Sequence, residues 1–328
     1  MVAGGGLVVL VAIAFSVGRF PVTPAELVTV LWAKLTGTPH GLPASIDTVV
    51  FNVRGPRIAA AILVGAALAA AGAAYQGLFR NPLVSPDILG VSTGAALGAV
   101  VGIYLSLGVV AIQTLAFVVG LGAVVVVYVV GMALRRHDPI LVLVLAGIVI
   151  GTLLGSCVSL LKYLADPYNQ LPAITFWLLG SLASVTQGDV RAVAPSVVLG
   201  LVPLVLLRWR MNVMTLGEDE ARALGVDTRR LRLAVVAAAT LMTAGVVSIS
   251  GVVGWIGLLV PHLARFLVGP DFRRLLPASI LLGSGYLLAV DTLARTIARI
   301  EIPLGVLTAF IGAPFFIWVL AAGRRGWQ

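Results

Sequence analysis

Long apolar runs fill most of this chain of 328 residues. A helix needs about 20 apolar residues to cross the roughly 30 Å of hydrocarbon in a bilayer. About ten runs approach that length, some of them short or broken, and they lie at approximately 3–19, 57–79, 88–107, 109–134, 139–163, 190–208, 231–250, 254–268, 275–298 and 303–321. The sequence therefore predicts an all-α polytopic membrane protein with about ten transmembrane helices.

The composition excludes a soluble globular protein. Hydrophobic residues make up 60% of the chain and charged residues 11%, whereas average soluble domains carry about 25% charged residues. A net charge of +9 would favour a nucleic-acid partner in a soluble chain. In a membrane protein the basic residues of loops set the orientation instead, so no nucleic-acid partner is expected.

The basic residues indicate which ends of the spans face the cytoplasm. If the N-terminus is cytoplasmic, an even number of spans places the C-terminus there as well. The inner loops then hold 14 of the 22 Lys and Arg residues, and the outer side holds 8. Because cytoplasmic loops carry the excess of Lys and Arg, we predict that both termini are cytoplasmic.

One stretch, Met214 to Leu233, reads like the surface of a soluble protein. Thr215 and Glu218 have the spacing of a capping box, which predicts a short helix that starts at Thr215. Gly225 can supply the left-handed residue that ends it. A helix of under three turns gains its order by packing, so two interpretations stay open: its apolar residues lie on the ends of the bundle, or they contact a soluble subunit.

The outer connection 20–56 closes with Arg54-Gly55-Pro56-Arg57. Proline fits the first turn of a helix, so we expect the second span to begin there. Two arginines spaced i, i+3 at a membrane rim could bind carboxylates, or they could extend to lipid headgroups.

Several further features favour structural interpretations. The third span has glycines at four-residue spacing, which predicts a tight helix crossing. These glycines are Gly90, Gly94, Gly98 and Gly102. Residues 164–189 hold an apolar piece that is too short to span. Asp291 lies four residues before Arg295, which predicts an ion pair on one helix face. His262 and Arg265 lack a second metal ligand at suitable spacing, so no metal site is expected.

Five motifs in order along the chain resemble the FecCD-type permeases of type II ABC importers, which have the BtuC-like fold and take up vitamin B12, iron siderophores and haem. The motifs are RGPR, GAALAAAGAAYQGLFRNPLVSPDILGVSTGAALG, LGEDEARALGV, GWIGLLVPHLARFLVGPDFRRLLP and IPLGVLTAFIGAPFFIWVL. The resemblance implies a single transmembrane domain over residues 1–328, with spans 2–5 and 7–10 as inverted repeats. It also implies a homodimer in a bacterial cytoplasmic membrane, two ATPase subunits inside, and a periplasmic or lipid-anchored binding protein outside.

The resemblance assigns roles to residues of this chain. The arginines that dock the binding protein correspond to Arg54, Arg57 and Arg295. The helices that couple to the ATPase correspond to about 215–230, and their contact residues are Leu216, Gly217, Glu218, Asp219, Glu220, Ala221, Arg222, Ala223, Leu224 and Gly225. The cytoplasmic gate corresponds to the turn at His137, Asp138, Pro139 and Ile140.

The function that this resemblance implies is transport by alternating access, driven by ATP in the partner ATPase subunits. The chain contains no phosphate loop of the GxxxxGK[ST] kind, so ATP and Mg²⁺ should bind to the ATPase subunit. We expect no catalytic residue and no cofactor in this chain, which is therefore not an enzyme. An ion-coupled secondary transporter is the alternative, and it needs buried titratable residues, of which Asp291 is nearly the sole candidate. The sequence leaves the cargo open among haem, a ferric siderophore, cobalamin and an oxyanion such as molybdate.

Overall fold

The computed structural model describes residues 2–134 and 139–322, and this part of the chain is helical without a strand. The elements are α1 (Val2–Ser16), α2 (Pro24–Thr36), α3 (Ala44–Asp47), the π-helix η1 (Thr48–Arg54), α4 (Gly55–Leu78), the 3-10 helix η2 (Pro86–Leu89), α5 (Val91–Tyr104), α6 (Val109–Ala133), α7 (Pro139–Leu164), α8 (Gln170–Leu179), α9 (Gln187–Met214), α10 (Glu218–Ala223), α11 (Thr228–Ser250), α12 (Ile256–Val268), α13 (Phe272–Ala294) and α14 (Leu304–Ala322).

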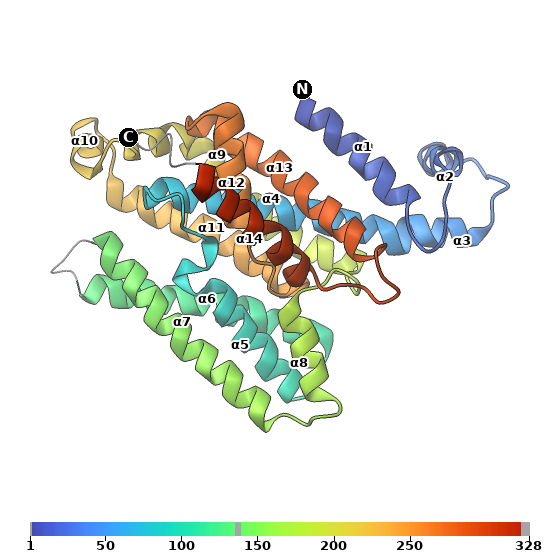
Figure 1. Cartoon of the computed structure of the whole chain (residues 1–328), viewed down its shortest axis with the longest axis horizontal. Helices are drawn as coiled ribbons and strands as arrows, with labels where there is room; N and C mark the ends of the chain where they lie inside the picture. The colour runs from blue at the N-terminus through green and yellow to red at the C-terminus, as the bar shows by residue number, and fades with distance from the viewer. Residues whose placement is uncertain (1, 135–138, 323–328) are drawn as a thin grey trace.

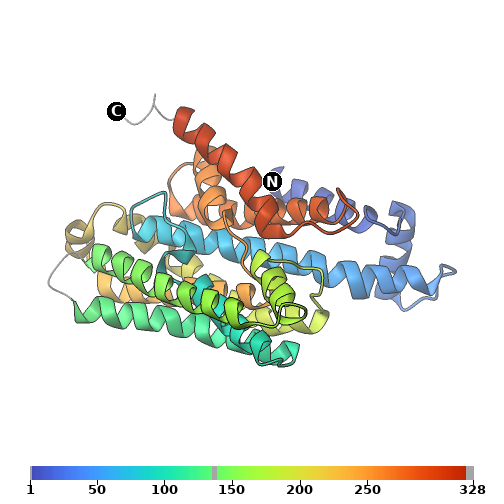
Figure 2. The same cartoon turned by 60° about the horizontal axis from the view of Figure 1, so that its bottom comes forward.

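Each of the predicted spans contains a helix, and the all-α fold is confirmed. Six helical segments of the described part are long and apolar enough to cross a membrane, and shorter apolar helices accompany them. The piece within 164–189 forms α8, which is too short to span, as predicted. The helices pack as an elongated bundle, with α2 and α3 at one end and α10 at the other (Figure 1). In Figure 2, α4 lies between α12–α14 on one side and α5–α7 on the other.

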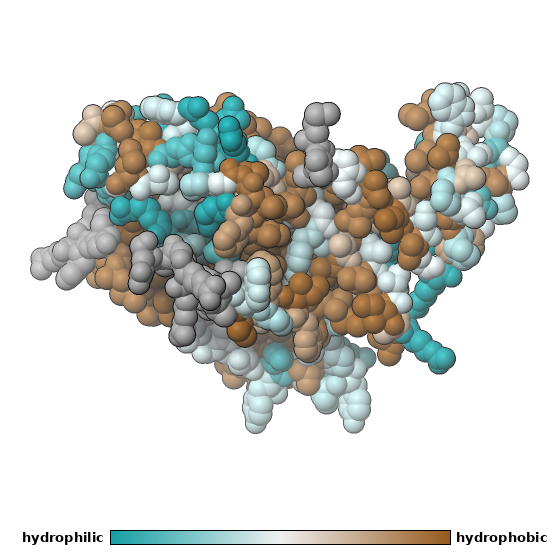
Figure 3. All heavy atoms as spheres, turned by 45° about the horizontal axis from the view of Figure 1, so that its top comes forward, coloured by the Kyte–Doolittle hydropathy of each residue, from teal (hydrophilic) through white to brown (hydrophobic). Residues whose placement is uncertain are grey.

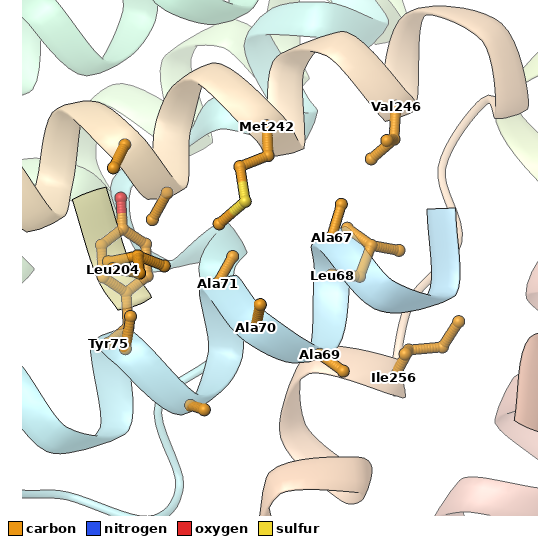
Figure 4. Close-up of a cluster of buried hydrophobic side chains, with 14 of the residues drawn as sticks. Ala67, Leu68, Ala69, Ala70, Ala71, Tyr75, Leu204, Met242, Val246 and Ile256 are labelled. Carbon is orange, nitrogen blue, oxygen red and sulfur yellow. The ribbon is translucent and has the colours of Figure 1, made fainter. Parts of the chain in front are cut away.

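The centre of the bundle is α4, which packs against α9, α11, α12 and α13. Its sequence is rich in alanine and glycine, and 19 of its 24 residues are buried. Small side chains allow this close approach, because packing takes the place of a hydrophobic driving force between helices in lipid. A Cβ atom on Gly72 would lie 1.9 Å from the carbonyl oxygen of Gly257 in α12. Figure 4 shows Ala67 to Ala71 of α4, four alanines and Leu68, close to Met242 and Val246 of α11 and Ile256 of α12.

A second tight crossing joins α5 to α6. A Cβ atom on Gly98 would lie 2.2 Å from the carbonyl oxygen of Leu115, and Gly94 and Gly102 also face α6 at close range. The predicted crossing is therefore confirmed for these three glycines. Gly90 has a different role, because its φ of 77° makes it the left-handed residue between η2 and α5.

The start of α4 differs from the prediction. The chain is already helical from Ala44, and η1 leads into α4 without a break, so Pro56 lies inside a continuous helical segment. A proline ring in a regular α-helix clashes with the carbonyl four residues earlier. Here the N–H of Gly55 bonds to the carbonyl of Val50, five residues back, and this π-turn accommodates the proline.

Candidate functional site

The polar stretch between α9 and α11 forms α10, but its first turn differs from the prediction. Helix α9 continues to Met214, and the Thr215 hydroxyl donates to the carbonyl of Asn212 at 2.6 Å. Gly217 is the N-cap residue of α10, and no side-chain cap bond is present there. The predicted capping box is therefore wrong, because the end of α9 already engages the Thr215 side chain.

Ion pairs connect α10 to α11. Glu218 pairs with Arg222 at 3.3 Å within α10 and with Arg232 of α11. At the other end of α10 the Gly225 N–H bonds to the Arg222 carbonyl and the next N–H bonds to the Ala221 carbonyl, each at 2.9 Å. This pair of bonds is a Schellman motif, and it uses the left-handed φ of 80° that was predicted for Gly225.

The apolar residues of this stretch divide between the two interpretations that the sequence left open. Ala221 is completely buried against the bundle, whereas Leu216 and Leu224 are 60% and 59% exposed. The side chain of Asp219 is also almost fully exposed. The described contacts therefore hold one face of α10 against the bundle. Leu216, Leu224 and Asp219 stay exposed on the side away from the bundle.

At the opposite end, a buried group of charges surrounds Arg57 of α4. Its Nε atom donates to both carboxylate oxygens of Asp291 in α13, at 3.0 Å each. Its two terminal nitrogens donate to the carboxylate of Glu301, at 2.8 and 3.0 Å. Arg57 is 8% exposed and Asp291 is 1% exposed. A guanidinium that is shared by two carboxylates is fixed in position, because its planar fork matches both partners.

The predicted ion pair between Asp291 and Arg295 is wrong. Arg57 of the neighbouring helix occupies both oxygens of Asp291. Arg295 is instead the C-cap residue of α13, and its guanidinium donates to the carbonyl of Ala14 in α1. Arg54 likewise donates to the carbonyls of Phe15 and Phe20. The three predicted docking arginines thus lie at one end of the bundle, and each holds a neighbouring segment of the same chain.

Two of the four predicted gate residues lie outside the described residues. His137 and Asp138 are among the residues that the structure does not describe. Pro139 is the first residue of α7, and Ile140 is partly buried and packs on the main hydrophobic core. Within 2–134 and 139–322, no group of three His, Cys, Asp or Glu side chains is placed to hold a metal ion.

The two candidate surfaces lie at opposite ends of the long axis. Helix α10 marks one end, and η1 with the Arg57 group lies toward the end that carries α2 and α3 (Figure 1). Figure 3 shows hydrophilic side chains gathered at the α10 end, on the left of that view. Since the apolar bundle separates them, one surface can face each side of a membrane.

The comparisons with known proteins identify the family. The profile of the FecCD transport family matches residues 6–322. The chain belongs to the FecCD transport family. It is 38% identical over 320 residues to the molybdate import system permease protein MolB of Haemophilus influenzae, covering 98% of this chain and 94% of that protein. It is 43% identical over 281 residues to the cobalamin import system permease protein BtuC of Halobacterium salinarum, covering 85% of this chain and 75% of that protein.

A solved structure shares the fold of this FecCD permease. It is a metal-chelate type ABC transporter in an inward-facing conformation, with a TM-score of 0.88 and 36% identity, and the match covers 98% of this chain and 97% of that one. The chain is therefore a multi-pass membrane permease subunit of an ABC importer, from a family that works with ATPase and substrate-binding partners.

Sequence reasoning missed two residues of this FecCD permease that complete the sites. Glu301 holds the terminal nitrogens of Arg57, and Arg232 holds Glu218. A signal for Glu301 existed, because no other acidic residue follows Asp291 in the sequence. No comparable signal distinguished Arg232 from Arg229 and Arg230.

Proposed function

We propose that this permease pairs with a second copy of itself, binds two ATPase subunits at the α10 end and receives its cargo from a periplasmic or lipid-anchored binding protein at the Arg57 end. The observation that carries the proposal is the placement of the two surfaces at opposite ends of an apolar bundle. ATP binding and hydrolysis, with Mg²⁺, belong to the ATPase subunit. The α10 end is then cytoplasmic, as are both termini.

The coupling role of residues 216–225 is supported by exposure at α10. Leu216 and Leu224 are exposed on either side of α10, which is held to the bundle by buried Ala221 and by the ion pairs of Glu218. Two exposed leucines beside a helix that is held in place by the bundle are suited to insert into a groove of a partner protein. Because α10 joins α9 directly to α11, force on it reaches both helices.

The docking role of Arg54, Arg57 and Arg295 is supported by their position and charge. Among the three, Arg295 is the most exposed, so a carboxylate of the binding protein would meet it first. A carboxylate that reaches Arg57 has to replace Glu301, whose side chain is 32% exposed, since Asp291 is buried. Docking would therefore exchange internal partners of the arginines for external ones.

The inverted repeats stay a prediction, which helix lengths support. Helices α4 to α7 contain 24, 14, 25 and 26 residues, and α11 to α14 contain 23, 13, 23 and 19. In both series the second helix is the short one. The gate at residues 137–140 falls between the last two long helices of the first series, and it also stays a prediction.

The proposed cargo is an iron chelate, either a siderophore complex or haem, or cobalamin. The family resemblance and the metal-chelate transporter of the same fold support this class. The relatives carry cargo as different as cobalamin and molybdate, so transport has to be measured directly.

The test is uptake into proteoliposomes that contain the permease with its ATPase and binding protein. Radiolabelled ferric siderophore, haem, cobalamin and molybdate are compared at equal concentration, with ATP and without it. We expect ATP-dependent uptake of one chelate or of cobalamin, unaffected by a protonophore. Uptake that needs a proton gradient and not ATP would instead establish the ion-coupled carrier. The engagement of Asp291 by Arg57 argues against that carrier, because such carriers need a titratable group that is free to exchange its ion.

A further inference from the structure

A cavity of about 500 Å³ opens at the α10 end of the bundle. It lies where the last turn of α4, helix α12 and the start of α13 meet. Most of its wall is apolar, including Phe266, Phe272 and Leu275. Two arginines, Arg80 and Arg265, also line it. The combination of an apolar wall with two cations is unlike a packed helix junction.

Neither guanidinium group forms an ion pair with a carboxylate of the described residues, although the Glu220 carboxylate lies beside Arg80 near Gly217. One terminal nitrogen of Arg265 donates to the side-chain oxygen of Gln76 at 2.7 Å, and Gln76 in turn faces backbone carbonyls of α12. No described carboxylate lies within the 4.0 Å of an ion pair from Arg80 or Arg265. Arg265 is partly buried, and burying a charge without a partner is costly, so this cation beside an apolar wall favours an anion that the exposed Arg80 can also reach.

His262 adds a second indication. It lines the same cavity from α12, one turn before Arg265. Both of its ring nitrogens are buried and lack a hydrogen-bond partner among the described residues. Buried polar atoms in native proteins are nearly always paired, so an unpaired ring that faces a cavity indicates a missing partner.

We propose that this cavity binds a phosphate-bearing anion, held by Arg80 and Arg265, and that its source is an anionic phospholipid. Guanidinium groups bind phosphate through paired charge-assisted hydrogen bonds. The apolar wall can contact an acyl chain, whereas it has no hydrogen-bond donor or charge for free phosphate. Phe266 and Leu267 are 68% and 64% exposed on the outer face of α12, so the cavity borders a surface that suits lipid. Basic pockets between helices at the cytoplasmic side of membrane proteins bind anionic headgroups in this way.

The experiment is native mass spectrometry of the delipidated full-length permease titrated with phosphatidylglycerol or cardiolipin, and with phosphatidylcholine of matched acyl chains. We expect one tight anionic lipid per chain and no comparable phosphatidylcholine adduct. Arg80→Gln should weaken this adduct about tenfold, the size of one charge-assisted contact. Arg265→Gln should weaken it at least as much. Arg274→Gln is the matched control, because Arg274 is exposed at the start of α13 and does not line the cavity.

The outcomes separate the possible occupants. Arg265→Gln loses the contact to Gln76 and could fail to fold. Arg80→Gln changes an exposed side chain, so its lipid affinity is the deciding measurement. Equal binding of phosphatidylcholine, or equal losses in Arg80→Gln and Arg274→Gln, would overturn the proposal. Displacement of the lipid by millimolar inorganic phosphate would support the phosphate site and overturn the lipid as its source. Displacement by the ATPase subunit alone would show that an acidic protein surface is the occupant instead.

Discussion

Replacing Asp291 by alanine tests the buried charge group at the end of the bundle opposite α10. The carboxylate is 1% exposed and accepts from Arg57 at 3.0 Å. Breaking a buried ion pair from one side costs about 3–5 kcal/mol, because the other charge stays buried without its partner. Glu301 still holds the two terminal nitrogens of Arg57. We therefore expect a loss near the lower end of that range, about 3 kcal/mol.

The same geometry predicts how much stability each of the other charged residues around Arg57 contributes. Arg57→Met leaves Asp291 buried without its ion-pair partner, which should cost about 4–5 kcal/mol. Glu301→Ala removes a carboxylate whose side chain is 32% exposed, so its loss should be about 1 kcal/mol or less. The double variant Arg57→Met with Asp291→Leu removes both buried charges and should recover most of the loss, since apolar pairs replace buried ion pairs well.

The assay is reversible unfolding of the purified permease in mixed micelles, followed by the fluorescence of its six tryptophans. Arg299→Met, at an exposed position of the same end, is the control and should change stability by less than about 0.5 kcal/mol. Equal losses for Asp291→Ala and Glu301→Ala would refute the reasoning. So would a double variant that is as unstable as Arg57→Met alone.

Three further predictions follow from single positions. Leu224→Asp, at a residue that is 59% exposed, should leave the unfolding temperature unchanged and abolish stimulation of the ATPase in the reconstituted complex, and unchanged ATPase stimulation would count against the coupling role. Gly98→Ala should cost about 1–3 kcal/mol through the clash with Leu115, whereas Gly122→Ala on α6, where a Cβ meets nothing within 4 Å, should be neutral in the same unfolding assay. Bonds from the Arg273 backbone and the Asn212 side chain hold the pKa of Asp271 below its ordinary 3.8. Because the folded pKa lies below the unfolded one, this cap stabilises the fold above the unfolded pKa, and its contribution is lost as the pH falls through the folded pKa. Stability measured against pH should therefore drop below about pH 4, and less steeply in Asp271→Asn.

Features that depend on neighbouring residues were predictable from the sequence. The spans follow from apolar length, and each contains a helix. The glycine spacing of the third span predicted the α5–α6 crossing, and Gly225 ends α10 as expected. One local signal was overlooked: Thr23 and Glu26 form a full capping box, and they start α2 within a segment described only as a connection.

Features that depend on distant residues were not predictable. Asp291 has Arg295 four positions away, yet its partner is Arg57, which is 234 positions away in the sequence. A four-residue spacing shows which side chains share a helix face and does not show what a neighbouring helix brings to that face. The capping box at Thr215 failed for a related reason. Its spacing is correct, but α9 extends further than its apolar run and engages the hydroxyl first.

One continuous helical segment joins the two candidate surfaces. It runs from Ala44 to Leu78 over 35 residues, roughly 52 Å at 1.5 Å per residue. Arg57, at the start of α4 within this segment, is bound to α13, and Gln76, near the end of the segment, is bound to Arg265 of α12. Because α4 is buried along most of its length against α9, α11, α12 and α13, a displacement of α4 would be transmitted to these packed helices. Helices α6, α7 and α9 are buried far less within this chain than α4 and α11, so the tight packing that could transmit a displacement along the bundle is concentrated around α4.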